Sequence, residues 1–121
     1  MKLAISSQGP DLTSPVDPRF GRAAYFVIYD TDSMESTAVS NAGNAVASQG
    51  AGVQAAQLVV RNQVDVVVAA NIGPKAFEAL QSAGIRMLAY NGGGTVGDAV
   101  EATRKDELTT HENANVRGHW S

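Results

Sequence analysis

Hydrophobic residues occur along the chain in short runs that polar and glycine-rich segments separate. The runs at residues 2–6 and 65–70 are continuous, which is typical of buried strands in a parallel sheet. Residues 25–29 are β-branched and aromatic, and residues 35–40 alternate more weakly after a turn, so this pair predicts an antiparallel hairpin. The short apolar run at residues 85–90 predicts a fifth strand.

Apolar residues recur at helical spacing behind three glycine-containing segments. The expected helices begin after residues 50–52, near Pro74 and after residues 91–94. The element order predicts an α/β fold, a three-layer mixed sheet of five strands (a hairpin plus parallel strands) with about three helices. Residues 1–103 are expected to form one domain, and residues 104–121, which show no sustained apolar face, a flexible charged tail.

The segment at residues 7–22 contains prolines and no periodicity, so it predicts a loop longer than compact domains usually hold without a function. Open α/β sheets bind ligands at the carboxyl ends of their strands, where this loop and the glycine-containing segments converge. Each of those segments opens a helix, whose first N–H groups favour an anion by about 0.3–1 kcal/mol. The glycines alone would equally suit tight turns. The candidate anion-binding residues are Ser7, Gln8, Arg19, Phe20, Gly21, Arg22, Gln49, Gly50, Gly52, Asn71, Ile72, Gly73, Asn91, Gly92, Gly93 and Gly94.

Two arginines, Arg19 and Arg22, give the long loop a candidate countercharge for an anion. Pairing with Asp11 or Asp17 is the alternative for these guanidinium groups. Asp30 and the other aspartates do not predict a metal-dependent nuclease, because the element order spreads them over different edges of the sheet.

Charge and composition exclude several classes of protein. A net charge of −3 argues against nucleic-acid binding, which needs a concentrated basic surface. No apolar run is long enough for a membrane span or a signal peptide, so we expect no membrane association and a cytoplasmic location. The chain has no cysteine, which excludes thiolate ligands and thiolate catalysis.

Catalytic and metal motifs are missing from the sequence. His111 and His119 lie eight residues apart in the predicted tail, a spacing that fits no common metal site, so we predict no direct metal ligand. The G-x-G-x-x-G/A matches at residues 50–55 and 92–97 lack the strand context of a Rossmann cofactor site. No hydrolase or kinase motif is present, and we therefore expect a protein that is not an enzyme.

Two blocks of sequence carry a family resemblance. Residues 14–23, SPVDPRFGRA, and residues 66–77, VVVAANIGPKAF, resemble the dinitrogenase iron-molybdenum cofactor biosynthesis family, and the resemblance covers residues 1–103. It implies a ribonuclease-H-like mixed sheet and a role in binding or delivering cofactor clusters. Cysteine-free, stand-alone chains of this size resemble carriers from sulfate-reducing bacteria, which implies a non-covalently bound molybdenum-copper sulfide cluster. Several relatives have a histidine near the first glycine loop, where residues 48–50 of this chain read SQG.

The leading hypothesis is a carrier of an anionic molybdenum-copper sulfide cluster in metal-cofactor handling or assembly, with a recipient protein or protein complex as its further partner. The rival is an enzyme or sensor that binds a nucleotide or phosphate in the same glycine-rich pocket. A protein-interaction module is a third reading of the same residues.

Overall fold

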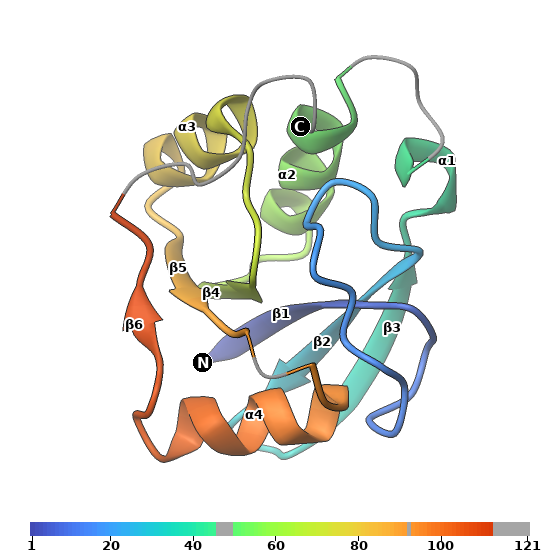
Figure 1. Cartoon of the computed structure of the whole chain (residues 1–121), viewed down its shortest axis with the longest axis vertical. Coiled ribbons are helices and arrows are strands. Elements are labelled where there is room, and N and C mark those ends of the chain that lie inside the picture. The colour runs from blue at the N-terminus through green and yellow to red at the C-terminus, as the bar shows by residue number, and fades with distance from the viewer. Residues whose placement is uncertain (46–49, 92, 113–121) are drawn as a thin grey trace.

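The computed structural model describes residues 1–45, 50–91 and 93–112. Its six strands form one sheet in the order β3-β2-β1-β4-β5-β6 (Figure 1). The strands are β1 (Lys2–Ser7), β2 (Tyr25–Asp30), β3 (Ser36–Ser40), β4 (Val66–Ala69), β5 (Arg86–Ala89) and β6 (Thr109–Thr110). The prediction of an α/β fold with a hairpin and parallel strands is confirmed, since β1 is antiparallel to β2 and parallel to β4.

Helices cover both faces of the sheet, so the described chain has three layers (Figure 1). The helices are α1 (Ala42–Ala45), α2 (Ala51–Arg61), α3 (Pro74–Ser82) and α4 (Val96–Arg104). One core lies between the sheet and α2 with α3, where Val59 and Leu80 are buried against Val67. The other lies between the sheet and α4, where Val96 packs against Ile5. β4 is buried on both faces, which explains its continuous apolar run.

The predicted number of strands is wrong because β6 gives no apolar signal. Thr110 pairs with Leu88 and Thr109 with Ala89, so backbone hydrogen bonding places this exposed two-residue strand beside β5. The number of helices also differs, because α1 is a single turn with no buried residue and therefore no apolar face to detect. The division of the chain at residue 103 stays a prediction, and residues 113–121 of the predicted tail lie outside the described residues.

No helix in the described part of the chain combines the length and apolar character that crossing a bilayer requires. The assignment of the sheet to the ribonuclease-H-like type stays a prediction.

Candidate functional site

The candidate site lies at the carboxyl ends of the parallel strands β1, β4 and β5. The loop that follows β1 crosses this edge, and Figure 1 shows it in blue between α2 above and α4 below. The same edge receives the segments that open α2, α3 and α4, as the element order predicts. The long loop pairs with two of these segments and packs against the third.

The first half of the loop covers the beginning of α4. Residues 12–16 run beside it, and the N–H groups of Val96 and Gly97 donate to loop carbonyl oxygens at 2.9 and 2.8 Å. The next N–H, that of Asp98, donates to the hydroxyl oxygen of Thr95 at 3.2 Å as part of a capping box. The N–H groups that open α4 are therefore already satisfied, so this helix has little left to offer an anion.

The second half of the loop joins the beginnings of α2 and α3. The N–H of Phe20 donates to the carbonyl oxygen of Asn71 at 3.0 Å, and the N–H of Asn71 donates to that of Pro18 at 2.8 Å. On the other side, Gly21 approaches Gly52 so closely that a Cβ on Gly21 would lie 2.9 Å from the Gly52 Cα. The predicted site residues of these three segments are thus brought together by backbone contacts.

Backbone donors remain at these two helix starts. Gly50 and Gly73 are the N-caps of α2 and α3, and neither provides a side-chain cap. The first helical N–H groups after each glycine have no hydrogen-bond acceptor among the described residues. Gly50 adopts a φ of 74°, a left-handed conformation that favours glycine at this position. Two of the three predicted helix termini can therefore still donate to an anion.

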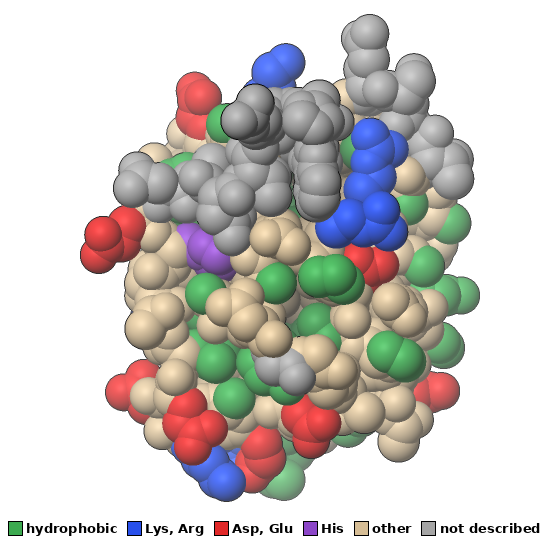
Figure 2. Space-filling model, in the orientation of Figure 1, with side chains coloured by type: hydrophobic (Ala, Val, Ile, Leu, Met, Phe, Trp, Pro, Cys, Tyr) green, Lys and Arg blue, Asp and Glu red, His purple; other side chains and the backbone are tan. Residues whose placement is uncertain are grey.

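The two arginines have different roles in the structure. Arg19 is about half exposed, with 53% of its side chain accessible, and its Nε lies 3.6 Å from Oδ1 of Asp17. The same carboxylate oxygen accepts the backbone N–H of Arg19 at 2.9 Å, so Asp17 contacts both the backbone and the Nε of Arg19. Arg22 is half-buried and donates through Nη1 to the carbonyl oxygen of Ala45 at 3.0 Å. Lys and Arg side chains gather beside an acidic side chain on the upper right of the face in Figure 2.

Several predicted site residues are buried beneath the site and have a structural role there. The side chains of Phe20 and Ile72 are fully buried in the core beneath α2 and α3, so they offer no surface to a ligand. The hydroxyl of Ser7, also buried, donates to the carbonyl oxygen of Gly9 at 2.6 Å. Gln8 is exposed.

The segment before α4 adds little buried structure to the site. Asn91 and Gly93 are exposed, while Gly94 is half-buried and accepts the N–H of Val16 at 2.9 Å. Gln49 and Gly92, the remaining predicted site residues, lie outside the described residues.

His111 is a further residue of this region, and the prediction of a flexible tail missed its position. Its N–H donates to the carbonyl oxygen of Met87 at 2.8 Å, which extends the pairing of β6 with β5. Its imidazole Nε2 lies 2.9 Å from the carbonyl oxygen of Ala69, the last residue of β4. His111 is half-buried. The sequence offers only the threonine pair before His111 as a signal of a strand here.

Asp65 and Asp30 lie away from the candidate site, as the sequence predicts. Asp65 accepts the N–H of Lys2 at 2.8 Å at the amino end of the parallel strands. Asp30 lies at the turn of the hairpin, where a hydrogen bond from the backbone N–H of Asp32 lowers the pKa of its carboxyl group. Among the described residues, no three His, Cys, Asp or Glu side chains form a group able to hold a metal ion.

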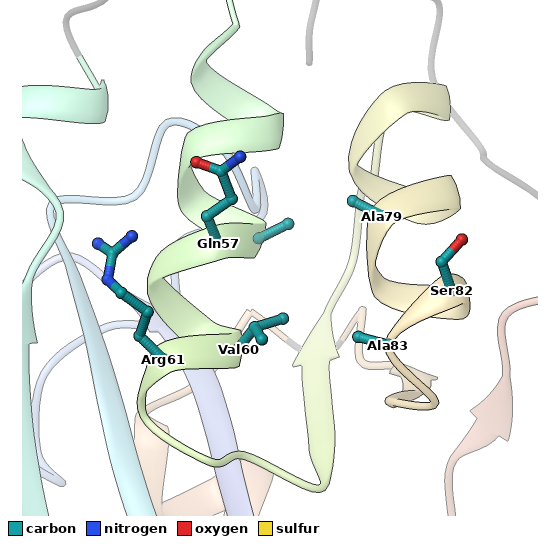
Figure 3. Close-up of a pocket in the computed structure, with 7 residues that line it drawn as sticks. Gln57, Val60, Arg61, Ala79, Ser82 and Ala83 are labelled. Carbon is teal, nitrogen blue, oxygen red and sulfur yellow. The ribbon is translucent and has the colours of Figure 1, made fainter.

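An apolar groove lies between α2 and α3, away from the glycine loops (Figure 3). Val60 and Arg61 of α2 line it together with Ala79 and Ser82 of α3 and with Ala83, which follows the last residue of α3. These residues lie at the C-terminal halves of the two helices, whereas the candidate site lies at their N-termini. The groove is therefore separate from the candidate site.

The family model described as dinitrogenase iron-molybdenum cofactor matches residues 1–106. The chain belongs to this family. The expected resemblance is therefore confirmed, and the match extends over the whole sheet except β6. A search of the curated proteins finds no match.

Two solved structures are similar to this chain over nearly its whole length. The apo form of the orange protein from Desulfovibrio gigas is 38% identical, covers 95% of this chain and 96% of its own, and superposes with a TM-score of 0.91. A putative NifB protein from Thermotoga, assigned to the DUF35 family, is 36% identical, with coverages of 95% and 97% and a TM-score of 0.84. Metal-cofactor handling is the activity that these relatives indicate for the family.

Proposed function

We propose that this chain binds and carries an anionic molybdenum-copper sulfide cluster, held non-covalently by the loops at the carboxyl edge of its sheet. The observation that carries the proposal is the near full-length similarity to the orange protein, at 38% identity. The sequence also resembles cysteine-free carrier proteins, and this resemblance implies a molybdenum-copper sulfide cluster as the bound cargo. The site geometry supports it, because residues 18–22 place Arg19 beside the open N-termini of α2 and α3.

The chemistry of the site suits a cluster that brings its own sulfide ligands. The chain has no cysteine and so no thiolate to donate to a metal. A sulfide accepts hydrogen bonds more weakly than oxygen does, so several donors should act together. Backbone N–H groups after Gly50 and Gly73, with the Arg19 guanidinium, supply donors and positive charge in a protein of net charge −3.

The proposed role is a carrier in metal-cofactor handling and not an enzyme. It would act in the cytoplasm and hand its cargo to a recipient protein or protein complex, without nucleic acid or membrane as a partner. The ribonuclease-H-like assignment belongs to the same proposal, supported by the mixed sheet in which antiparallel strands adjoin parallel ones. A shared fold alone would bring no nuclease chemistry with it.

Reconstitution of the purified chain tests the proposal. Apo-protein is mixed with tetrathiomolybdate and a copper(I) salt, passed through a desalting column, and analysed for visible absorption and for molybdenum and copper. We expect both metals and a sulfide charge-transfer band to elute with the protein in the presence of excess phosphate and ATP. Loss of the metals to either competitor would favour the nucleotide or phosphate site instead, and absence of both metals without any competitor would contradict cluster carriage.

Arg19→Ala is expected to weaken retention of the cluster about tenfold, because a hydrogen bond to a charged group contributes about 1.5 kcal/mol. The free energy of unfolding should change by less than about 0.5 kcal/mol, since this side chain is largely exposed. Arg104→Ala is the matched control, because Arg104 is similarly exposed and pairs with Glu101 on α4 at 3.0 Å. Retention is measured by competition with a copper(I) chelator, and equal retention by both variants and the parent would remove Arg19 from the site.

A further inference from the structure

Asp17 is a charged residue that the fold buries at the candidate site. Only 7% of its side chain is accessible, and no other Asp, Glu, Lys or Arg is buried among the described residues. Its N–H donates to the carbonyl oxygen of Ser6 at 2.9 Å, and its own carbonyl oxygen accepts the buried hydroxyl of Ser6 at 2.9 Å. Ser6 belongs to the carboxyl end of β1, so the backbone of Asp17 is fixed at the edge of the sheet where the candidate site lies.

The carboxylate of Asp17 contacts Arg19 twice. Its Oδ1 accepts the backbone N–H of Arg19 at 2.9 Å and lies 3.6 Å from Nε of the guanidinium. Arg19 is held beside Asn71 by a parallel bridge, and Asn71 lies two residues before Gly73, the N-cap of α3. The candidate countercharge for an anion therefore has a fixed negative charge at its side.

This pairing changes which anions the site attracts. A carboxylate beside a guanidinium repels the same ion that the guanidinium attracts, so their combined field a few ångströms away is weak. Compact oxyanions such as phosphate concentrate their charge and bind arginine through its planar fork of N–H groups, one edge of which Asp17 faces here. A sulfide cluster spreads its charge over more atoms, so its binding depends less on net charge and more on several weak N–H donors.

We infer that Asp17 is a specificity-determining residue of the candidate site, whose carboxylate offsets the charge of Arg19 and thereby excludes phosphate and similar compact oxyanions. The inference rests on the proposed function for the identity of the cargo that stays bound. Glycine-rich helix N-termini would otherwise suit phosphate well. Specificity of this kind comes from repelling the wrong ligand as well as from attracting the right one.

Phosphate binding by two neutral variants tests the inference without any cluster. Asp17→Asn removes the charge and keeps an oxygen to accept the N–H of Arg19, and Asp17→Ser offers a hydroxyl for the same bond. Asp11→Asn is the matched control, because it changes the net charge equally at an exposed position of the same loop. Inorganic phosphate is titrated at constant ionic strength into each ¹⁵N-labelled protein, and the amide shifts of residues 18–22 and 71–75 are followed.

Both Asp17 variants are expected to bind phosphate about tenfold more tightly than the parent, with Asp11→Asn equal to the parent. The gain should disappear in the double variant Asp17→Asn/Arg19→Ala, since it acts through the guanidinium. An equal gain in Asp11→Asn, a gain that persists without Arg19, or no gain in the Asp17 variants would overturn the inference. Failure of both Asp17 variants to show a cooperative thermal transition would make Asp17 a structural residue and overturn it as well.

Cluster retention separates this role from the proposed function. After loading with tetrathiomolybdate and copper(I), Asp17→Asn should retain both metals as well as the parent does, and only the variant should lose them when excess phosphate is added. Loss of the metals by the variant without phosphate, or retention that phosphate does not reduce, would overturn the inference. A tenfold gain in phosphate affinity by the variants, together with a parent that never retains the metals, would support exclusion by Asp17 and contradict cluster carriage.

Discussion

Replacing Phe20 with alanine is expected to lower the free energy of unfolding by about 3–5 kcal/mol, the usual cost of emptying a fully buried aromatic position. Phe20 has no exposed surface, and its ring centroid lies 5.0 Å from that of Phe26 in the core beneath α2 and α3. Its N–H also donates to Asn71, so the residue anchors the long loop to the segment before α3. Chemical denaturation of the metal-free protein measures the effect.

The control for this substitution is Phe77→Ala. Phe77 belongs to α3 and packs against the same core, but it is only partly buried, so its removal should cost clearly less. The sequence analysis includes Phe20 among the candidate anion-binding residues. If Phe20→Ala kept its stability but lost cluster binding, Phe20 would act by contacting the ligand. That result would contradict its role as a core residue.

Gly21→Ala is expected to destabilise the protein by about 1–3 kcal/mol and to weaken cluster retention at the same time. The added Cβ would lie 2.9 Å from the Cα and 3.0 Å from the N of Gly52, and these backbone atoms of α2 cannot rotate away. Relief of the clash must therefore separate the long loop from the N-terminus of α2. The midpoint of thermal unfolding and the metal content after desalting measure the two effects.

Gly43→Ala provides the matched control, since a Cβ at Gly43 meets nothing within 4 Å. Gly43 lies in α1, where alanine is favoured over glycine by about 0.5–1 kcal/mol, so the control should be neutral or slightly stabilising. Equal stability and equal metal content for Gly21→Ala and the parent would contradict the close approach of the loop to α2.

The apolar pattern was sufficient to predict the central elements of the fold. Continuous runs identified β1 and β4, because strands covered on both faces need apolar residues at every position. Pro74 marked the first residue of α3, where its missing N–H costs nothing. Each of these elements follows from the residues of its own segment, so the sequence alone is enough to predict it.

What the sequence could not predict depends on contacts between distant segments. β6 forms because Thr109 and Thr110 pair with the edge of β5. The sequence of these two residues alone does not predict a strand. The donors that open α4 are occupied by carbonyl oxygens from residues 12–14, about 80 residues earlier in the chain. The sequence made Phe20 a candidate site residue because it lies between two arginines in a loop without periodicity. Its burial follows from the pairing of the loop with Asn71.

The central claim is that the cargo binds at the N-termini of α2 and α3, where the long loop joins them. Amide chemical-shift mapping of ¹⁵N-labelled apo-protein during addition of tetrathiomolybdate and copper(I) tests this claim most directly. We expect the largest changes in residues 18–22, 50–54 and 71–75, and smaller ones in residues 93–96, because the N–H groups that open α4 are already bonded. Largest changes in the hairpin turn at residues 30–36, with the two helix starts unaffected, would contradict the account.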